Sequence, residues 1–98
     1  MSRYAIFVTI QLKPGMADRF RPHILKNAQA AVDKEADCHS FSVMTAEDDS
    51  DRFHFHEVYT DKAALDLHRR QPHFLEFFEA TKDMVLSKTV QGLWVEHG

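Results

Sequence analysis

The chain has 98 residues, of which 44% are hydrophobic and 28% charged, and its formal net charge is −3. Chains of this length fold as one domain, so residues 1–98 are expected to form a single unit. The lysines and arginines are scattered rather than clustered, which argues against a nucleic-acid partner. No apolar run is long enough to span a membrane, so no membrane partner is expected either.

Cysteine usage and the N-terminal residues bear on the compartment. Cys38 is the single cysteine of the sequence, so no internal disulfide can form. The N-terminus lacks the apolar core of a signal peptide. Since disulfide-free proteins are the rule in reducing compartments, we expect a cytoplasmic protein.

The first half of the chain predicts a strand, a long helix and a second strand. Residues 3–12 alternate between two faces, as a strand does, and one face carries Tyr4, Ile6, Val8, Ile10 and Leu12. Lys13-Pro14-Gly15 ends this strand, because proline lacks a backbone donor and glycine tolerates turn geometry. Residues 16–35 repeat apolar side chains at helical spacing, and residues 39–46 alternate again.

The second half predicts two more strands around a pair of helices. Acidic residues 47–51 form a hairpin connection to a third strand at 52–60. Thr60 or Asp61 can cap a helix that runs to about residue 70, and Pro72 suits the first turn of another helix. Residues 85–96 predict a last strand. This element order is typical of a ferredoxin-like α+β fold, with an antiparallel sheet and helices on one face.

Such an arrangement leaves the far face of the sheet uncovered. Neither face of the first strand is fully polar, and the last strand carries apolar residues on both faces. Uncovered apolar sheet surface is a site of association. We therefore expect a homodimer that packs sheet to sheet.

The third strand separates its side chains into two sets. One face carries Phe53, Phe55, Glu57 and Tyr59, and the other carries His54, His56 and Val58. Desolvation among aromatic side chains would raise the pKa of Glu57 and make it a candidate base near neutral pH. The alternative is a structural carboxylate that pairs with a cation or accepts hydrogen bonds from the backbone or Tyr59.

His54 and His56 form a His-x-His pair with Cα atoms about 7 Å apart. With His39, His68 or His73 they could hold a metal, but spacing alone assembles no complete ligand set. The alternative is a pair of half-buried imidazoles at the dimer face that hydrogen-bond to their neighbours. We favour this alternative, so His54 and His56 are secondary candidates and no metal site is predicted.

His68 and His73 flank the break between the two later helices. His73 falls in a first turn, where free N–H groups and the helix dipole favour a neutral imidazole that can exchange a proton in a cleft. The alternative is that His73 only covers the helix junction. Phe74, Phe77 and Phe78 lie at helical spacing and are chiefly core, but where they face the aromatic side chains of the third strand they could also line a flat, apolar cavity. The residues expected to form this substrate pocket are Phe53, Phe55, Phe74 and Phe78.

Common cofactor motifs are missing from the sequence. It holds no P-loop, no dinucleotide-binding glycine fingerprint and no Gly-x-Ser-x-Gly elbow. Three glycines leave little room for loops that cradle phosphate groups. Nucleotide cofactors are therefore not expected.

One block of the chain resembles the antibiotic biosynthesis monooxygenase family. It runs from Arg52 to Asp61 and continues through Ala64-Leu65, His68 and Gln71-Pro72-His73-Phe74. Members typically carry an aromatic strand ending in Glu-x-Trp or Glu-x-Tyr, an acidic helix start, a helical histidine and a Pro-His-aromatic junction. Lys13-Pro14-Gly15 and Glu35 before Cys38 also match. The chain departs at Ala36-Asp37, where members often have x-Gly, and at Tyr59, where tryptophan is common.

The resemblance implies a dimeric ferredoxin-like fold with an apolar pocket between sheet and helices in each subunit. Family activities include oxygenation of quinols and polycyclic phenols without metal or flavin, so it also implies no cofactor. A related branch isomerises a phosphorylated sugar-derived signal, and more distant members degrade haem. Residues that match Glu57, Tyr59, His68 and His73 line or border the pocket in such proteins.

On this resemblance, we expect a monooxygenase whose partners are a small aromatic substrate and O₂. A phenolate is far more electron-rich than a phenol, so a base in a dry pocket prepares the substrate to reduce O₂. His68 or His73 is expected as the base, with Glu57 and Tyr59 orienting the substrate.

Two alternatives stay open. The same acid–base groups could isomerise a small phosphorylated carbonyl compound, with Arg69, Arg70 or Lys88 as cationic partners for the phosphate. The chain could instead be a dimeric binding module without activity. Haem degradation has less support, because no axial-ligand arrangement stands out in the sequence.

Overall fold

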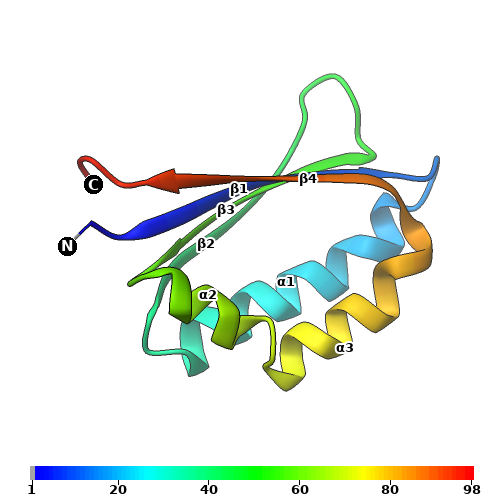
Figure 1. Ribbon diagram of the computed structural model, residues 1–98. Coiled ribbons are helices and arrows are strands. Elements are labelled where there is room, and N and C mark those ends of the chain that lie inside the picture. The colour runs from blue at the N-terminus through cyan, green and yellow to red at the C-terminus, as the bar shows by residue number, and fades with distance from the viewer. Residues whose placement is uncertain (1) are drawn as a thin grey trace.

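The computed structural model describes residues 2–98 (Figure 1). In chain order its elements are β1 (Tyr4–Leu12), α1 (Ala17–Lys34), β2 (Cys38–Thr45), β3 (Arg52–Tyr59), α2 (Lys62–His68), α3 (Pro72–Thr81), the 3₁₀ helix η1 (Lys82–Met84) and β4 (Val85–Trp94). Every strand and α-helix expected from the sequence is present, with ends that differ by at most two residues. The short helix η1 was not anticipated.

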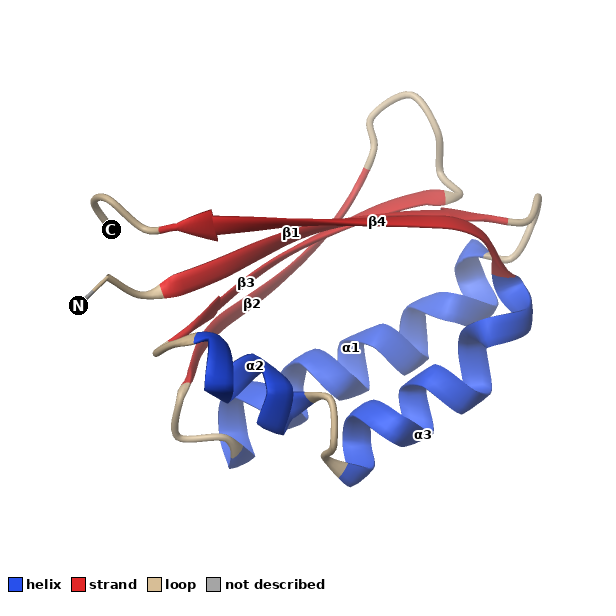
Figure 2. Cartoon of the chain, in the orientation of Figure 1, coloured by secondary structure: helices blue, strands red, loops and turns tan. Residues whose placement is uncertain are grey.

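The strands form one sheet in the order β2-β3-β1-β4, with antiparallel neighbours throughout. The α-helices pack on one face of this sheet, so the molecule has two layers (Figure 2). This is the ferredoxin-like α+β fold that the element order predicts. Its second helix is divided into α2 and α3, and residues 69–71 connect the two parts.

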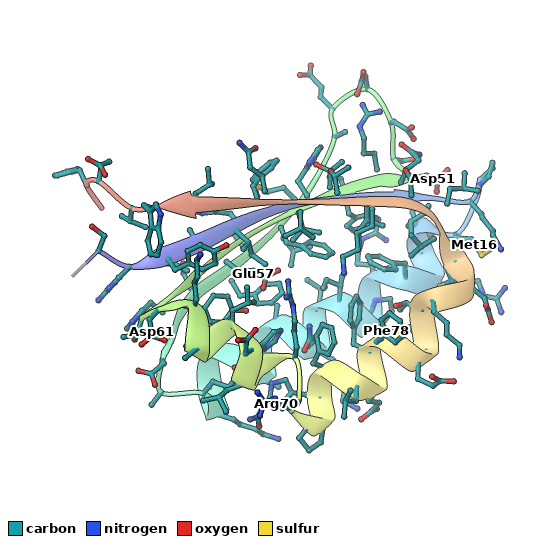
Figure 3. All side chains as sticks on the ribbon, in the orientation of Figure 1. Met16, Asp51, Glu57, Asp61, Arg70 and Phe78 are labelled. Atoms are coloured by element: carbon teal, nitrogen blue, oxygen red, sulfur yellow. The ribbon has the colours of Figure 1, made fainter. Side chains whose placement is uncertain are left out.

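The central strands β1 and β3 alternate between a buried inner face and a half-buried outer face. Ile6 pairs with Glu57 and Val8 pairs with Phe55, and all four residues are buried. In β3, His54 lies between the buried residues Phe53 and Phe55, so its side chain is on the outer face. The register therefore places the Glu57 carboxylate in the layer between sheet and helices (Figure 3). Phe53, Phe55 and Tyr59 are buried on the same face, as the alternation along the strand predicts.

Helix α1 packs against the sheet through one stripe of small and apolar residues. Its buried members are Ala17, Phe20, Ile24, Asn27, Ala28 and Ala31. Their spacing of three, four and seven residues puts them on one helical face. Asn27 is the polar member of this stripe.

Two aspartates set the starts of helices. The carboxylate of Asp51 accepts hydrogen bonds from the N–H groups of Gly15 at 3.1 Å and Ala17 at 3.2 Å, so the β2–β3 hairpin fixes the beginning of α1 (Figure 3). Asp61 Oδ1 accepts a hydrogen bond from the N–H of Ala64 at 2.8 Å and caps α2. Of the two caps considered for this helix, the structure uses Asp61.

The outer face of the sheet carries a mixture of apolar and polar side chains. Within the described residues 2–98, no helix covers this face. Homodimerisation through it stays a prediction. None of the helices in the described part of the chain is long and apolar enough to cross a membrane.

Candidate functional site

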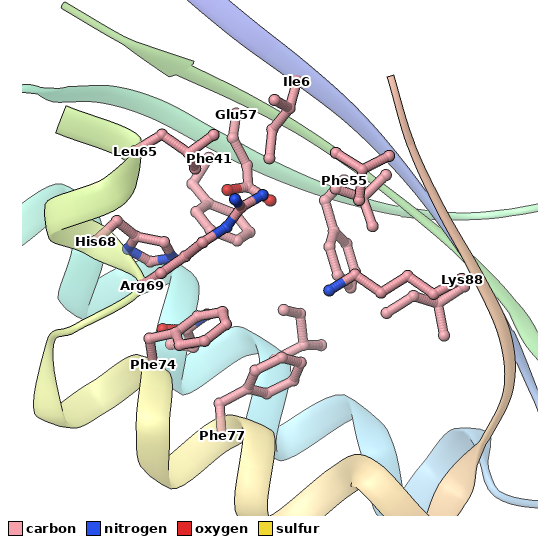
Figure 4. Close-up of a pocket in the computed structure, with 15 residues that line it drawn as sticks. Ile6, Phe41, Phe55, Glu57, Leu65, His68, Arg69, Phe74, Phe77 and Lys88 are labelled. Atoms are coloured by element: carbon pink, nitrogen blue, oxygen red, sulfur yellow. The ribbon is translucent and has the colours of Figure 1, made fainter. Parts of the chain in front are cut away.

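A pocket lies between the inner face of the sheet and the helices (Figure 4). Its walls are Ile6, Val8, Ile10, Ile24, Asn27, Phe41, Phe55, Glu57, Leu65, His68, Arg69, Phe74, Phe77, Lys88 and Val90. The free volume is about 30 Å³, which corresponds to about two water molecules. A ligand with an aromatic ring must therefore displace side chains at the edge of the pocket.

Glu57 brings a carboxylate into this apolar pocket. It is 4% exposed, and the hydroxyl of Tyr59 donates a hydrogen bond to its Oε1 at 2.6 Å. Burial raises the pKa of Glu57 to about 7, although Tyr59, Arg69 and Lys88 each act to lower it. The carboxyl group therefore changes its charge near neutral pH, as its aromatic surroundings in the sequence suggest.

Tyr59 stands behind Glu57 rather than in the pocket. It is fully buried, and burial together with the Glu57 carboxylate raises the pKa of its hydroxyl. That hydroxyl stays protonated and already donates to Glu57. This hydrogen bond orients the Glu57 carboxylate. Tyr59 is not among the residues that line the pocket, and the substrate contact expected for it from the sequence stays a prediction.

Three chain segments bring Glu35, His68 and His73 together. Glu35 follows the last residue of α1, His68 is the last residue of α2, and His73 is the second residue of α3. The Oε2 atom of Glu35 lies 2.7 Å from Nδ1 of His68 and 2.5 Å from Nε2 of His73. All three side chains are less than one tenth exposed.

This geometry determines the tautomer of His68. A carboxylate oxygen only accepts hydrogen bonds, so Nδ1 of His68 carries the proton that points to Glu35. Burial lowers the pKa of His68, which outweighs the opposite effect of the Glu35 carboxylate. A neutral ring with a protonated Nδ1 has its lone pair on Nε2. His68 lines the pocket, and its Nε2 atom can therefore accept a proton.

Two cations border the pocket where it meets solvent. Arg69 follows α2 and Lys88 comes from β4; both are exposed, and both side chains reach into the pocket from opposite sides (Figure 4). Partial burial and the charge of Arg69 lower the pKa of Lys88. Both cations also act on the Glu57 carboxyl group, whose pKa they lower, and they can interact with an anionic group at the mouth of the pocket.

Glu35, His68 and His73 are also the residues best placed for a metal. Their ligand atoms lie within 4.8 Å of one another. In the present arrangement one carboxylate oxygen is at hydrogen-bond distance from both rings, where it accepts two N–H groups. A metal at 2.0–2.2 Å from each ligand would take the place of those protons, so this oxygen would have to move aside.

The two histidines of β3, His54 and His56, lie away from the pocket. His54 and His56 occupy the outer face of the sheet. Nδ1 of His54 is 3.0 Å from Oγ1 of Thr9, and its ring stacks on Phe7 with centroids 5.3 Å apart. His54 thus has a cross-strand hydrogen-bond partner of the kind that the alternative to a metal site expects.

Two of the four aromatic residues expected in the pocket line it. Phe55 and Phe74 do so, whereas among the described residues Phe53 and Phe78 are outside its walls. Phe53 packs in the core beside Phe20, with ring centroids 5.0 Å apart, and Phe78 is 48% exposed. Phe77 takes the expected place of Phe78, because it lies one residue earlier on α3 and turns toward α1 and the sheet.

Sequence reasoning gave no role to two residues of the site. Glu35 was noted only as part of the family resemblance, since it lies 33 positions from its partner His68. Asn27 left a clearer signal, because it interrupts the apolar stripe of α1.

Cys38 is buried, and burial raises its pKa to about 12, so its thiol is not a nucleophile here.

Comparison with known proteins gives a consistent result. The sequence model of the family described as antibiotic biosynthesis monooxygenase matches residues 3–80. An uncharacterised protein of Synechocystis, sll1783, is 32% identical over 79 residues, a match that covers 78% of this chain and 51% of that protein. The chain therefore spans about half the length of this curated relative.

Solved structures share the fold. A protein of Lactobacillus acidophilus named "putative monooxygenase" is 26% identical with a TM-score of 0.90, and the match covers 96% of this chain and 44% of that one. PA3566 of Pseudomonas aeruginosa is 24% identical with a TM-score of 0.89, over 99% of this chain and 97% of that one. The second likeness concerns the fold alone.

Proposed function

The chain belongs to the antibiotic biosynthesis monooxygenase family, and we propose that it is a cofactor-independent monooxygenase acting on a quinol or phenolic small molecule. The observation that carries this proposal is the buried contact between Glu35 and His68 at the pocket wall. A neutral imidazole that a carboxylate holds in one tautomer is suited to remove a proton from a hydroxyl group.

The apolar part of the pocket suits a flat aromatic substrate. Phe41, Phe55, Phe74 and Phe77 contribute rings to its walls, and aromatic rings favour stacked or edge-on contacts with one another. The mouth between Arg69 and Lys88 consists of long, exposed side chains. Their displacement provides the room that the small free volume lacks.

The first step is proton transfer from a substrate hydroxyl to Nε2 of His68. A phenol has a pKa near 10, and the pKa of His68 is lowered, so this transfer is unfavourable unless the phenolate is stabilised. Arg69 and Lys88 place positive charge at the same pocket. The phenolate is the electron-rich form that reacts with O₂.

Oxygen then acts as the oxidant. The phenolate transfers one electron to O₂, and the phenoxyl radical and superoxide combine at a ring carbon to form a C–O bond. The peroxide anion takes the proton held by His68. Loss of the C–H proton at that carbon, with cleavage of the O–O bond, leaves a carbonyl and hydroxide, which departs with this proton as water. A hydroquinone and O₂ thus give a hydroxyquinone and water.

The test is O₂ uptake by chelator-treated protein with a panel of hydroquinones and polycyclic phenols. We expect uptake above the autoxidation rate, with one atom of ¹⁸O₂ in the product and one in water. His68→Ala should lower kcat by about 10²–10⁴-fold, while His97→Ala, an exposed control, should not change it. Uptake no faster than autoxidation would reject the proposal. Activity lost on chelation and restored by a metal would reject its cofactor-independent form.

A specific observation favours a second candidate. Arg69 and Lys88 line one pocket together with Glu57 and His68, which suits a phosphorylated carbonyl compound as well as a phenolate. In such a substrate, Glu57 and His68 could move a proton next to the carbonyl while the cations hold the phosphate. Isomerisation consumes no O₂, so the same oxygen electrode separates the two functions.

A further inference from the structure

Asn27 is a polar side chain in an apolar position. It is 2% exposed, and its neighbours along the stripe of α1 are Phe20, Ile24 and Ala31. Asparagine is a weaker helix former than the alanines beside it. Compared with an alanine or leucine at this position, Asn27 therefore adds neither helix propensity nor buried apolar surface.

The amide oxygen of Asn27 has no partner. It accepts no hydrogen bond from any group in residues 2–98, and it is the one buried side-chain nitrogen or oxygen of this part of the chain left in that state. Buried polar groups are nearly always paired, because an unpaired one loses its bonds to water without replacement. Each exception calls for a physical explanation.

The place of Asn27 in the fold supplies such an explanation. Asn27 lines the same pocket as Glu57 and His68, but from α1, whereas Glu57 comes from β3 and His68 from α2. The other pocket residue from α1, Ile24, is apolar. On the α1 side of the pocket, Asn27 is thus the polar wall residue, separate from Glu57 and His68.

We propose that Asn27 accepts a hydrogen bond from a second hydroxyl group of the substrate, so that the pocket selects dihydroxyaromatic compounds over monohydroxy ones. This inference rests on the proposed function, in which the first hydroxyl gives its proton to His68. A hydroxyl is a donor that fits an unpaired carbonyl oxygen. An analogue without it leaves the oxygen unpaired when the pocket closes, and is therefore rejected.

The experiment compares two ligands of nearly equal shape, hydroquinone and 4-methylphenol, by calorimetric titration under nitrogen. Binding without O₂ is independent of turnover, and it avoids the different oxidation potentials of the two compounds. We expect the wild-type protein to bind hydroquinone about 10–100-fold more tightly. Asn27→Leu, which keeps the size and removes the polar atoms, should abolish this preference by weakening hydroquinone binding.

Thermal unfolding of the free protein provides a second measurement. Asn27→Leu should raise the Tm, because it removes an unpaired buried oxygen. Gln29→Leu, an amide-to-leucine change at an exposed position of the same helix, is the control and should leave the ligand preference intact. Should Asn27→Leu be unstable, Asn27→Ala in the same titration serves instead.

The outcomes separate this inference from the proposed function. A preference that survives in Asn27→Leu, or a wild-type protein that binds neither compound, would overturn the inference. If O₂ uptake occurs while Asn27→Leu keeps the preference for hydroquinone, the monooxygenase proposal is supported and the proposed role of Asn27 is rejected. If the preference depends on Asn27 but no O₂ is consumed, the selectivity of the pocket is supported and the monooxygenase proposal is rejected.

Discussion

The Oε2 atom of Glu35 lies 2.7 Å from Nδ1 of His68, and both side chains are buried, although 33 residues separate them in the chain. The same oxygen lies 2.5 Å from Nε2 of His73. One carboxylate thus orients an imidazole that lines the pocket and ties α3 to the end of α1. In the proposed mechanism, the orientation of the base and the packing of the helix layer therefore depend on the same side chain.

Glu35→Gln should lower kcat and move its acid limb to lower pH. Burial lowers the pKa of His68 from 6.5, and the Glu35 carboxylate opposes that shift. Without the carboxylate the pKa falls further, so the neutral base persists to lower pH. The measurement is the pH dependence of kcat in both proteins, with the acid limb of the wild type below pH 6.5. An acid limb that stays in place would show that Glu35 does not act on the base.

Glu57→Gln should flatten the dependence of stability on pH. The pKa of Glu57 is raised from 4.5 to about 7, so the folded state holds its proton more tightly than the unfolded state. Its contribution to stability is complete below about pH 4.5 and is lost as pH rises through about 7. Full ionisation corresponds to about 3 kcal/mol for a shift from 4.5 to about 7.

Urea unfolding between pH 5 and pH 9 checks this prediction. The wild-type protein should lose stability over this range, and Glu57→Gln should lose much less. Glu47→Gln, in the exposed hairpin, should keep the wild-type profile. Identical profiles for wild type and Glu57→Gln would mean that Glu57 ionises in the folded protein as it does in water.

Phe77→Ala should widen the range of ring sizes that the pocket accepts. Phe77 lines the pocket and contacts Phe20 edge-on, with ring centroids 5.7 Å apart. Its truncation should lower KM for bicyclic substrates relative to monocyclic ones and cost about 2–3 kcal/mol of stability. Phe78→Ala, the adjacent and exposed position, is the control; equal effects of both changes on KM would place the pocket elsewhere.

We expect the wild-type protein to form a sheet-to-sheet dimer at micromolar concentration, which light scattering measures. Phe7 and His56 pair across β1 and β3 on the uncovered outer face. A glutamate at position 7 would bury its charge in such an interface, so Phe7→Glu should convert a dimer into a monomer. A monomeric wild-type protein would disprove the dimer, and a dimeric Phe7→Glu variant would move the interface to another surface.

The sequence by itself determined the elements and their order. Alternation over β1 and β3 and the helical spacing in α1 follow from local geometry, and the strand pattern alone separated Glu57 from His54 and His56. The elevated pKa of Glu57 was predicted for the same reason, since its aromatic neighbours lie within two residues along the strand. Such features depend on short stretches of chain.

Only the tertiary structure decided which groups meet in the pocket. Phe77 rather than Phe78 lines it, because the rotation of α3 about its axis is fixed by packing against α1. Glu35 reaches His68 and His73 because three helix ends converge, and the unpaired oxygen of Asn27 is visible only once its surroundings are known. Contacts between distant segments depend on how whole elements pack, which no local pattern in the sequence encodes.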